Sequence, residues 1–304
     1  MEILFCGSGW LDIVDLIAAR LPPGDRLRRW TRDRPLADEV TAAPPEVLLP
    51  SNGRVDAAVI EAAAARGLRL IQQPATGVDA IDLAAAAAHG IPVCNAPGAN
   101  QVAVAEAALL LLLLCARRWP VARERFVHGV IGAPLGVELA GSRLVVIGGG
   151  RTGGALASRA RALAMEVQVL GSATTRAGLL AALAAADAVS LHCPLTPRTR
   201  GLIDAEALAA LPAHAIVVNV ARGPIVDRAA LEAALARGHL GGVGLDVFWQ
   251  EPWDPRDPLF AHPKVVTLPH VGGSTVGAFT GIAGVVIENL ARLRRGEPLL
   301  HRVA

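Results

Sequence analysis

The stretch RLVVIGGGRTG, residues 143–153, decides the fold that we expect for this chain. Its first five residues are typical of a buried β-strand, and a helix-compatible run follows the glycines to about residue 164. Gly148 permits a tight turn, Gly150 lets the backbone approach a pyrophosphate, and Gly153 lets the helix pack on the strand. The helix N-terminus then offers N–H groups to a phosphate. The pattern predicts a dinucleotide-binding turn; a glycine-rich turn without ligand is the alternative.

Outward from this turn, strands and helices alternate over the second half of the chain. Besides 143–147, we expect strands at residues 167–170, 188–193, 215–220, 242–247 and 264–268. Strands that alternate with helices are parallel and are joined by crossover helices. Six of them predict a doubly wound sheet of the kind that binds dinucleotides.

A similar alternation precedes the turn. We expect strands at residues 2–6, 47–50, 70–72 and 91–94, with helices between them at 11–21 and 55–66. A long apolar helix at 102–118, a loop at 129–136 and a final helix at 282–295 complete the pattern. The expected class is α/β, with two doubly wound parallel-sheet domains.

The composition favours a globular protein with a large core. Hydrophobic residues make up 53% of the 304 residues and charged residues 18%, which argues against disorder. The net charge is +2 and the basic residues are dispersed, so we expect no nucleic-acid partner. The four cysteines show no CxxC and no metal-like spacing. We therefore expect no metal, and free thiols in a reducing cytosol.

Neither the N-terminal sequence nor the most apolar run suggests a membrane protein. The N-terminal sequence MEILFCGSGW is typical of a first strand and not of a signal peptide. The most apolar run, 102–116, carries Glu106 and is shorter than the roughly 20 residues that a spanning helix needs. We expect a cytoplasmic protein without a membrane partner.

The end of the second strand of the expected cofactor domain is neutral. NAD-specific sites place an acid about 20 residues after the glycine turn, where it binds the ribose 2′-hydroxyl. Here that position is Gly171, and Glu166 lies at the other end of the strand. A neutral end followed by Arg176 would tolerate a 2′-phosphate. We therefore expect NADP in preference to NAD, with Arg176 as a candidate phosphate ligand.

Three later segments carry groups suited to proton and hydride chemistry. They are NVARG (219–223), DVFWQEP (246–252) and PHVGG (269–273), each near the carboxyl end of a predicted strand. Arg222 could hold a carboxylate through two charge-assisted hydrogen bonds. His270 could pass a proton to a carbonyl oxygen, and Glu251 could fix the ring tautomer and favour the charged ring. Each alone is commonly structural, but together at one sheet edge they predict an oxidoreductase site.

These segments resemble a known family over nearly the whole chain. VNVARGPIVD (218–227), GLDVFWQEP (244–252) and PHVGGST (269–275) are similar to three signatures of the D-isomer-specific 2-hydroxyacid dehydrogenases. ATGVDAID (75–82), NAPGANQVAVAE (95–106) and HCPLTPRTRGLI (192–203) resemble the family's substrate-loop, interdomain and nicotinamide-side segments. The resemblance implies NAD(P)-dependent hydride transfer to or from C2 of a small 2-keto or 2-hydroxy acid. Glyoxylate/hydroxypyruvate reductases and phosphoglycerate dehydrogenases are the nearest kinds.

The resemblance also implies residue roles. Arg222 would bind the substrate, with Glu251 and His270 as the acid/base pair, and the backbone N–H groups of Thr76 and Gly77 would hold the substrate carboxylate. Asp246 would contact the nicotinamide side. With the glycine turn and the neutral strand end, the expected cofactor contacts are Gly148, Gly150, Arg151, Thr152, Gly153, Gly171, Arg176, Pro194, Thr199, Val220, Ala221, Asp246, Gly272 and Gly273.

The family's organisation completes these expectations. A flavodoxin-like substrate domain would comprise residues 1–98 and 275–304, with a Rossmann-type cofactor domain, 99–274, inserted in it. A homodimer through the cofactor domains is implied. Three departures stand out: Gly171 replaces the family's acid, the stretch from there to Asp187 is short, and Ala75 stands where Gly is usual. The chain stops soon after its last predicted helix, so we expect no regulatory domain, which argues against a feedback-regulated phosphoglycerate enzyme.

Two other functions stay open at this point. One is a dinucleotide-sensing binding protein, similar to co-repressors of this fold, without significant turnover. The other is a decayed paralogue that binds cofactor poorly. The short stretch from Gly171 to Asp187, where the adenosine of the cofactor would bind, is consistent with this possibility. The sequence does not choose the keto acid, because one methylene changes binding by only about 1–3 kcal/mol. Glyoxylate, hydroxypyruvate or a related short 2-keto acid is the substrate class that we expect.

Overall fold

The computed structural model describes all residues, 1–304, and divides into two α/β units. Unit 1 comprises Met1–Asn100 and Ser274–Ala304, and unit 2 comprises Gln101–Gly273. These boundaries differ by one or two residues from those predicted above. Each unit has a wholly parallel sheet, which confirms the predicted α/β class.

Unit 1 is built on a five-stranded sheet with the order β2-β1-β3-β4-β5. This 2-1-3-4-5 order is that of flavodoxin-like folds. All its neighbouring strands are parallel, so each connection is a crossover. The strands are β1 (Glu2–Phe5), β2 (Arg26–Arg29), β3 (Val47–Leu49), β4 (Leu70–Gln72) and β5 (Val93–Cys94).

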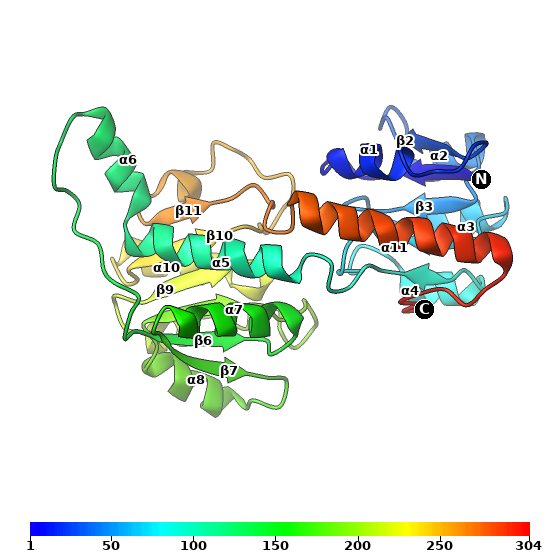
Figure 1. The fold of residues 1–304 in the computed structure, drawn as a ribbon. Coiled ribbons are helices and arrows are strands. Elements are labelled where there is room, and N and C mark those ends of the chain that lie inside the picture. The colour runs from blue at the N-terminus through cyan, green and yellow to red at the C-terminus, as the bar shows by residue number, and fades with distance from the viewer. The chain divides into compact units, whose positions relative to one another are not determined.

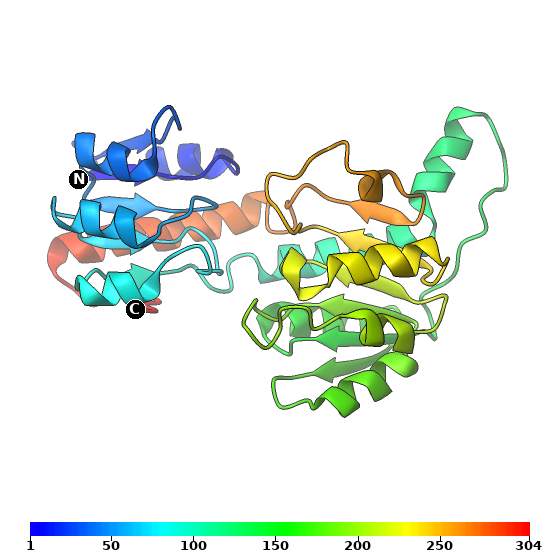
Figure 2. The ribbon, with the colours of Figure 1, turned by 180° about the vertical axis from the view of Figure 1, so that it is seen from behind.

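Helices cover both faces of the unit 1 sheet (Figures 1 and 2). On one face lie α1 (Asp12–Ala18) and α11 (Val276–Arg295). The other face is covered by α2 (Leu36–Ala42), α3 (Ala57–Ala64) and α4 (Leu83–Ala88). By length and composition alone α11 could span a membrane, but its buried apolar residues pack into the unit 1 core against β1, β3 and β4.

Unit 2 has six parallel strands in the order β11-β10-β9-β8-β6-β7. Counted within the unit, this order is 2-1-3-4-5-6, whereas dinucleotide-binding sheets usually have 3-2-1-4-5-6. The short segment from Gly171 to Asp187 explains the difference, because it holds only helix α8 and no strand beyond β7. The strands are β6 (Arg143–Ile147), β7 (Glu166–Leu170), β8 (Ala188–Leu191), β9 (Ile216–Asn219), β10 (Gly242–Leu245) and β11 (Val265–Thr267).

The unit 2 sheet is also covered on both faces, and its central strands β8, β9 and β10 are fully buried. Helices α5 (Gln101–Ala116) and α7 (Arg151–Ala162) pack on one face, seen in front in Figure 1. Helices α8 (Arg176–Ala184), α9 (Ala205–Ala210) and α10 (Arg228–Ala236) pack on the other, seen in Figure 2. Two short 3-10 helices, Gly223–Ile225 and Pro258–Ala261, lie in the loops after β9 and β10.

One part of unit 2 projects away from its sheet. Helix α6 (Trp119–Val127) has no buried residue, and a long loop follows it (Figure 1). We call residues 119–137 the arm. Its apolar side chains are exposed, with Phe126 at 79%, Ile131 at 97% and Leu135 at 86%. The core of unit 2 therefore leaves the apolar residues of the arm uncovered.

Candidate active site

The carboxyl ends of three neighbouring strands bring the predicted catalytic residues to one edge of the unit 2 sheet. In the register of the sheet Asn219 of β9 lies beside Leu245 of β10, and Leu245 lies beside Thr267 of β11. Arg222 and His270 each follow three residues after the ends of β9 and β11, and Glu251 lies in the loop after β10. Parallel pairing thus gathers groups that are far apart in sequence.

His270 and Glu251 form an ion pair at this edge. His270 Nδ1 lies 2.7 Å from Glu251 Oε2, and the two side chains are 26% and 27% exposed. Burial raises the pKa of the Glu251 carboxyl, but the hydrogen bond and the charge of His270 outweigh it. The N–H of Phe248 and the charge of Arg222 act in the same direction, so this pKa lies below its usual value. Glu251 is therefore an anion that holds one ring nitrogen of His270.

Asp246 fixes the loop that carries His270. It is 2% exposed, and its carboxylate accepts hydrogen bonds from the N–H groups of Val271 (2.8 Å) and Gly272 (2.9 Å). His270 has a left-handed backbone with φ of 52°, a conformation that persists only where the surroundings impose it. Burial raises the pKa of Asp246 to about 6, although His270 and both N–H groups oppose the rise. The carboxylate acts on the backbone beside the catalytic ring; its predicted contact with nicotinamide stays a prediction.

Arg222 lies on a turn that a buried amide holds. Asn219 is fully buried; its Nδ2 donates to the Arg222 carbonyl (2.8 Å) and its Oδ1 accepts from Ala221 N (3.0 Å). A Cβ on Gly223 would lie 2.2 Å from the Phe248 backbone. Only glycine allows this approach, which places the Arg222 turn directly against the loop of Glu251.

Aromatic side chains anchor the loop of Glu251. The Phe248 ring packs 4.4 Å from that of Trp253 and 5.1 Å from that of Phe260, measured between ring centroids. Trp249 Nε1 donates to the carbonyl of Val226 at 2.7 Å. The backbone N–H of Phe248 donates to Glu251 Oε1 at 3.0 Å. These contacts hold the carboxylate in place from its own loop.

The predicted dinucleotide turn lies at the same edge, between β6 and α7. Gly148 has φ of 110°, and a Cβ there would lie 2.6 Å from the carbonyl carbon of His192, so no other residue fits. Gly150 precedes the first turn of the twelve-residue helix α7, and no side chain caps that helix. A Cβ on Gly150 would meet nothing within 4 Å. The open space before a helix N-terminus fits a pyrophosphate, with Arg151 and Thr152 in that first turn.

The other predicted cofactor residues follow strand ends of unit 2. Pro194 and Thr199 lie in the loop after β8, Val220 and Ala221 directly after β9, Gly171 directly after β7, and Gly272 and Gly273 in the loop after β11. Thr76 and Gly77 belong to unit 1 and follow β4. Hydrogen bonds from Asn95 and Gln73 go to the carbonyl oxygens of this loop, at 2.8 and 2.9 Å.

Arg176 differs from the others, because its side chain is engaged within the protein; its expected role in binding a 2′-phosphate stays a prediction. Its guanidinium is bonded to Asp204 at 2.6 Å, to Glu206 at 2.7 Å and to the carbonyl of Leu202 at 3.1 Å. The side chain thus ties the start of α8 to the start of α9. Two carboxylates compensate the charge of this guanidinium in the structure, which weighs against Arg176 as the ligand of a phosphate.

The sequence interpretation gave no role to Asn219, Arg198 or the His192 side chain. His192 follows β8 against the glycine turn, with Nε2 2.8 Å from Ser190 Oγ. Burial lowers the pKa of His192 to about 4, so its ring is neutral at pH 7. The position of His192 directly after an apolar strand is the sequence signal that could have pointed to this residue. Arg198 lies in the loop after β8 and donates to the carbonyl of Ser172 at 3.3 Å.

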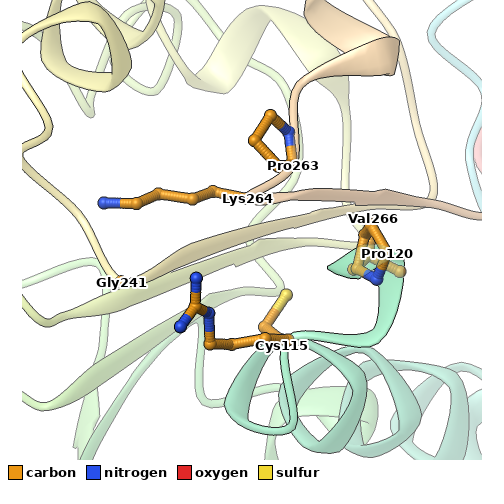
Figure 3. Close-up of a pocket in the computed structure, with 7 residues that line it drawn as sticks. Cys115, Pro120, Gly241, Pro263, Lys264 and Val266 are labelled. Carbon is orange, nitrogen blue, oxygen red and sulfur yellow. The ribbon is translucent and has the colours of Figure 1, made fainter. Parts of the chain in front are cut away.

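A small hollow in unit 2 lies away from this site. It lies at the amino ends of β10 and β11, beside Gly241 and Lys264, where Cys115 of α5 also reaches it (Figure 3). Its volume of about 10 Å³ leaves room for one water molecule at most. The predicted catalytic groups lie at the opposite, carboxyl ends of the strands.

Comparison with known proteins identifies the family. A sequence model of the D-isomer specific 2-hydroxyacid dehydrogenase NAD binding domain matches residues 109–272. The glyoxylate reductase of Korarchaeum cryptofilum is 38% identical over 260 residues, which cover 80% of this chain and 77% of that protein. The D-3-phosphoglycerate dehydrogenase of Archaeoglobus fulgidus is 36% identical over 269 residues, which cover 84% of this chain and 51% of that protein.

The solved structures agree. An NADPH-dependent glyoxylate/hydroxypyruvate reductase from Sinorhizobium meliloti, in complex with NADP and malonate, is 30% identical with a TM-score of 0.86; the match covers 100% of this chain and 96% of that one. The chain spans about half the length of the phosphoglycerate dehydrogenases that it matches. It contains an NAD-binding domain, and it belongs to the family of D-isomer-specific 2-hydroxyacid dehydrogenases.

Proposed function

We propose that this protein is an NAD(P)-dependent reductase of short 2-keto acids, which it converts to D-2-hydroxy acids. The observation that carries the proposal is the His270–Glu251 pair, 2.7 Å apart, at the sheet edge that also carries Arg222 and the glycine turn. An anion-binding group, a proton donor and a dinucleotide-binding turn are what this reaction requires. The glyoxylate reductase among the relatives supports the substrate class.

Each group has a part in the reaction. The Arg222 guanidinium holds the substrate carboxylate and so orients the C2 carbonyl. His270 donates a proton to the C2 oxygen, and Glu251 stabilises the charged ring before the transfer. The bound nicotinamide supplies the hydride. Asp246 keeps the His270 loop in place through the N–H groups of Val271 and Gly272.

A spectrophotometric panel tests the activity directly. Purified protein is mixed with NADPH or NADH and with glyoxylate, hydroxypyruvate, pyruvate or 3-phosphohydroxypyruvate, and absorbance at the reduced cofactor's band is followed. We expect cofactor oxidation with one or more of the short 2-keto acids. If no substrate supported oxidation of either cofactor while both cofactors bound, the protein would instead be a dinucleotide-sensing binding protein.

We further propose that NADP is preferred to NAD, because the end of β7 lacks a carboxylate. An acid there would bond to the ribose hydroxyls of NAD and repel a 2′-phosphate. Gly171 provides neither effect, and a Cβ on it would meet nothing within 4 Å. A side chain therefore fits at this position without displacing the fold.

Gly171→Asp is the variant that tests this preference. We expect the natural protein to have a higher kcat/KM with NADPH than with NADH, and the variant to reverse the order. Steady-state kinetics with both cofactors at fixed keto acid give the two ratios. Gly154→Asp, an open position inside α7, serves as a control that should leave the ratio unchanged. An NADH preference in the natural protein would contradict the proposal.

We also propose a homodimer that forms through unit 2, with the arm as its interface. Phe126, Ile131 and Leu135 are almost fully exposed, and monomeric proteins rarely leave such apolar surface uncovered. Light scattering after gel filtration should give about twice the mass of one chain, 31.4 kDa. Ile131→Asp combined with Leu135→Asp should shift the mass to that of one chain, whereas the control Val276→Asp, at an exposed position of unit 1, should not. A single-chain mass for the natural protein would refute the dimer.

A further inference from the structure

No further strand covers β7, because β7 is an edge strand of the unit 2 sheet. Figure 1 shows β7 followed directly by α8, with no further strand beside it. Val169 on this strand is 38% exposed. The backbone continues through Gly171 and Ser172 without an acidic residue until α8 begins. In dinucleotide-binding folds the adenosine ribose lies at this strand end.

The cation that reaches this strand end comes from another loop. Arg198, in the loop after β8, donates through Nη2 to the carbonyl oxygen of Ser172 at 3.3 Å. Its side chain is exposed, and it takes part in no ion pair of the structure. A guanidinium has five N–H donors, so one hydrogen bond leaves it able to bind an anion through two prongs.

The loop holds Arg198 in a fixed turn. Thr199 Oγ1 donates to the carbonyl of Pro194 at 2.6 Å and accepts from the N–H of Thr196 at 2.8 Å. These two hydrogen bonds link Thr199 to residues 194 and 196 and so fix the backbone turn that contains residue 198. An arginine on an ordered turn loses less conformational entropy on binding than one on a mobile chain.

Two carboxylates near the start of α9 are already paired with another arginine. Asp204 and Glu206 are both bonded to Arg176, at 2.6 and 2.7 Å. Arg176 thereby neutralises the acids near the start of α8, which would otherwise repel a phosphate at the strand end. Arg198, which contacts the segment after β7 through Ser172, has no ion pair of its own.

We infer that Arg198, together with the N–H groups of Ser172 and Ala173, forms the subsite for the 2′-phosphate of NADPH. The inference rests on the NADP preference proposed above and names the residue responsible for it. Binding at this subsite involves no covalent step. Arg198 acts on cofactor choice alone and does not take part in proton or hydride transfer.

The test is cofactor binding in the absence of keto acid, so that turnover does not enter. Dissociation constants for NADPH and NADH are measured by calorimetry for the natural protein, Arg198→Ala, Arg198→Lys and the control Arg200→Ala. Arg200 is exposed on the same loop and has no ion pair of its own. Arg198→Ala should weaken NADPH binding by about tenfold or more, since charge-assisted hydrogen bonds are lost, and change NADH binding less than about twofold. Arg198→Lys should fall between, because it keeps the charge and loses the two-pronged geometry.

Other results would overturn the inference. Equal weakening of NADPH and NADH would mean that Arg198 supports the loop and not the phosphate. An equal NADPH loss in Arg200→Ala would mean that the loop's net charge acts, without a subsite. If the natural protein bound NADH more tightly, the NADP preference would fail, yet a loss confined to NADPH in Arg198→Ala would still support the subsite. Failure of the keto-acid panel bears on neither result, because only binding is measured.

Discussion

Replacement of His270 by Gln should lower kcat for keto-acid reduction by about 10²-fold or more, which is the contribution of a positioned general acid. Gln can form hydrogen bonds but cannot release a proton to the C2 oxygen. Because His270 has φ of 52°, the substitution could also disturb the loop. His270→Asn controls for this effect, since Asn tolerates the left-handed conformation well. Both variants should show the same loss of kcat, with an unchanged Kd for the cofactor.

Glu251→Gln provides the matching measurement. It removes the anion that lies 2.7 Å from His270 Nδ1 and keeps the size of the side chain. Reduction requires a proton on the ring, and the anion of Glu251 stabilises the charged ring and fixes its orientation, so the variant should have a lower kcat. Rates at saturating cofactor and keto acid give this loss. Near-natural kcat in both His270 variants would remove His270 from the role of proton donor.

Arg222→Lys should lower kcat/KM by roughly 10–100-fold, the effect of losing a charge-assisted hydrogen bond to a carboxylate. Lysine keeps the positive charge but lacks the planar, two-pronged guanidinium. Arg222 has an extended backbone, with φ of −149°, which lysine also adopts without strain. The loss therefore reports side-chain chemistry.

The readout that separates substrate binding from cofactor binding is the Kd for NADPH. Arg222→Lys should leave this Kd nearly unchanged, because Arg222 is assigned to the keto acid. An alternative substrate without a carboxylate, such as glyoxal, should be reduced equally slowly by the natural protein and the variant. A variant that lost cofactor affinity and kept its KM for the keto acid would place Arg222 on the wrong half of the site.

The parts of the fold that sequence predicted are those with a strong apolar pattern. The strand at 143–147 was predicted to the residue, because five residues of a buried strand stand directly before a glycine turn. Strand β2 was missed, since its sequence RLRR lies on the sheet edge and places arginines where an apolar alternation would be the signal. The last helix begins at Val276, six residues earlier than predicted. Gly277 and Gly281 weaken the helical pattern there, while the Thr275 side chain caps the helix through Ala278 N.

The predicted site depended on topology, whereas the contacts of Arg176 are ones that topology does not fix. Parallel strands end at one edge, so the convergence of Arg222, Glu251 and His270 followed from their places after strands. The role expected of Arg176 assumed that nearness in sequence to Gly171 meant nearness of the side chain. Its actual partners lie 28 and 30 residues away in the chain. Side-chain pairing at that distance depends on how α8 packs, which no local pattern encodes.

The interruption of unit 1 by unit 2 sets an order of events during synthesis. Domains generally fold as units while the chain emerges from the ribosome. Unit 2 is one continuous stretch, and it can complete its core once Gly273 has emerged. Strands β1–β5 emerge first, yet one face of their sheet waits for Phe279, Ile282 and Val286 of α11. The strands of unit 1 are therefore made before unit 2, yet they are among the last to be buried. Nascent chains from which α11 has not yet emerged expose an apolar sheet face, on which chaperones or other chains can act.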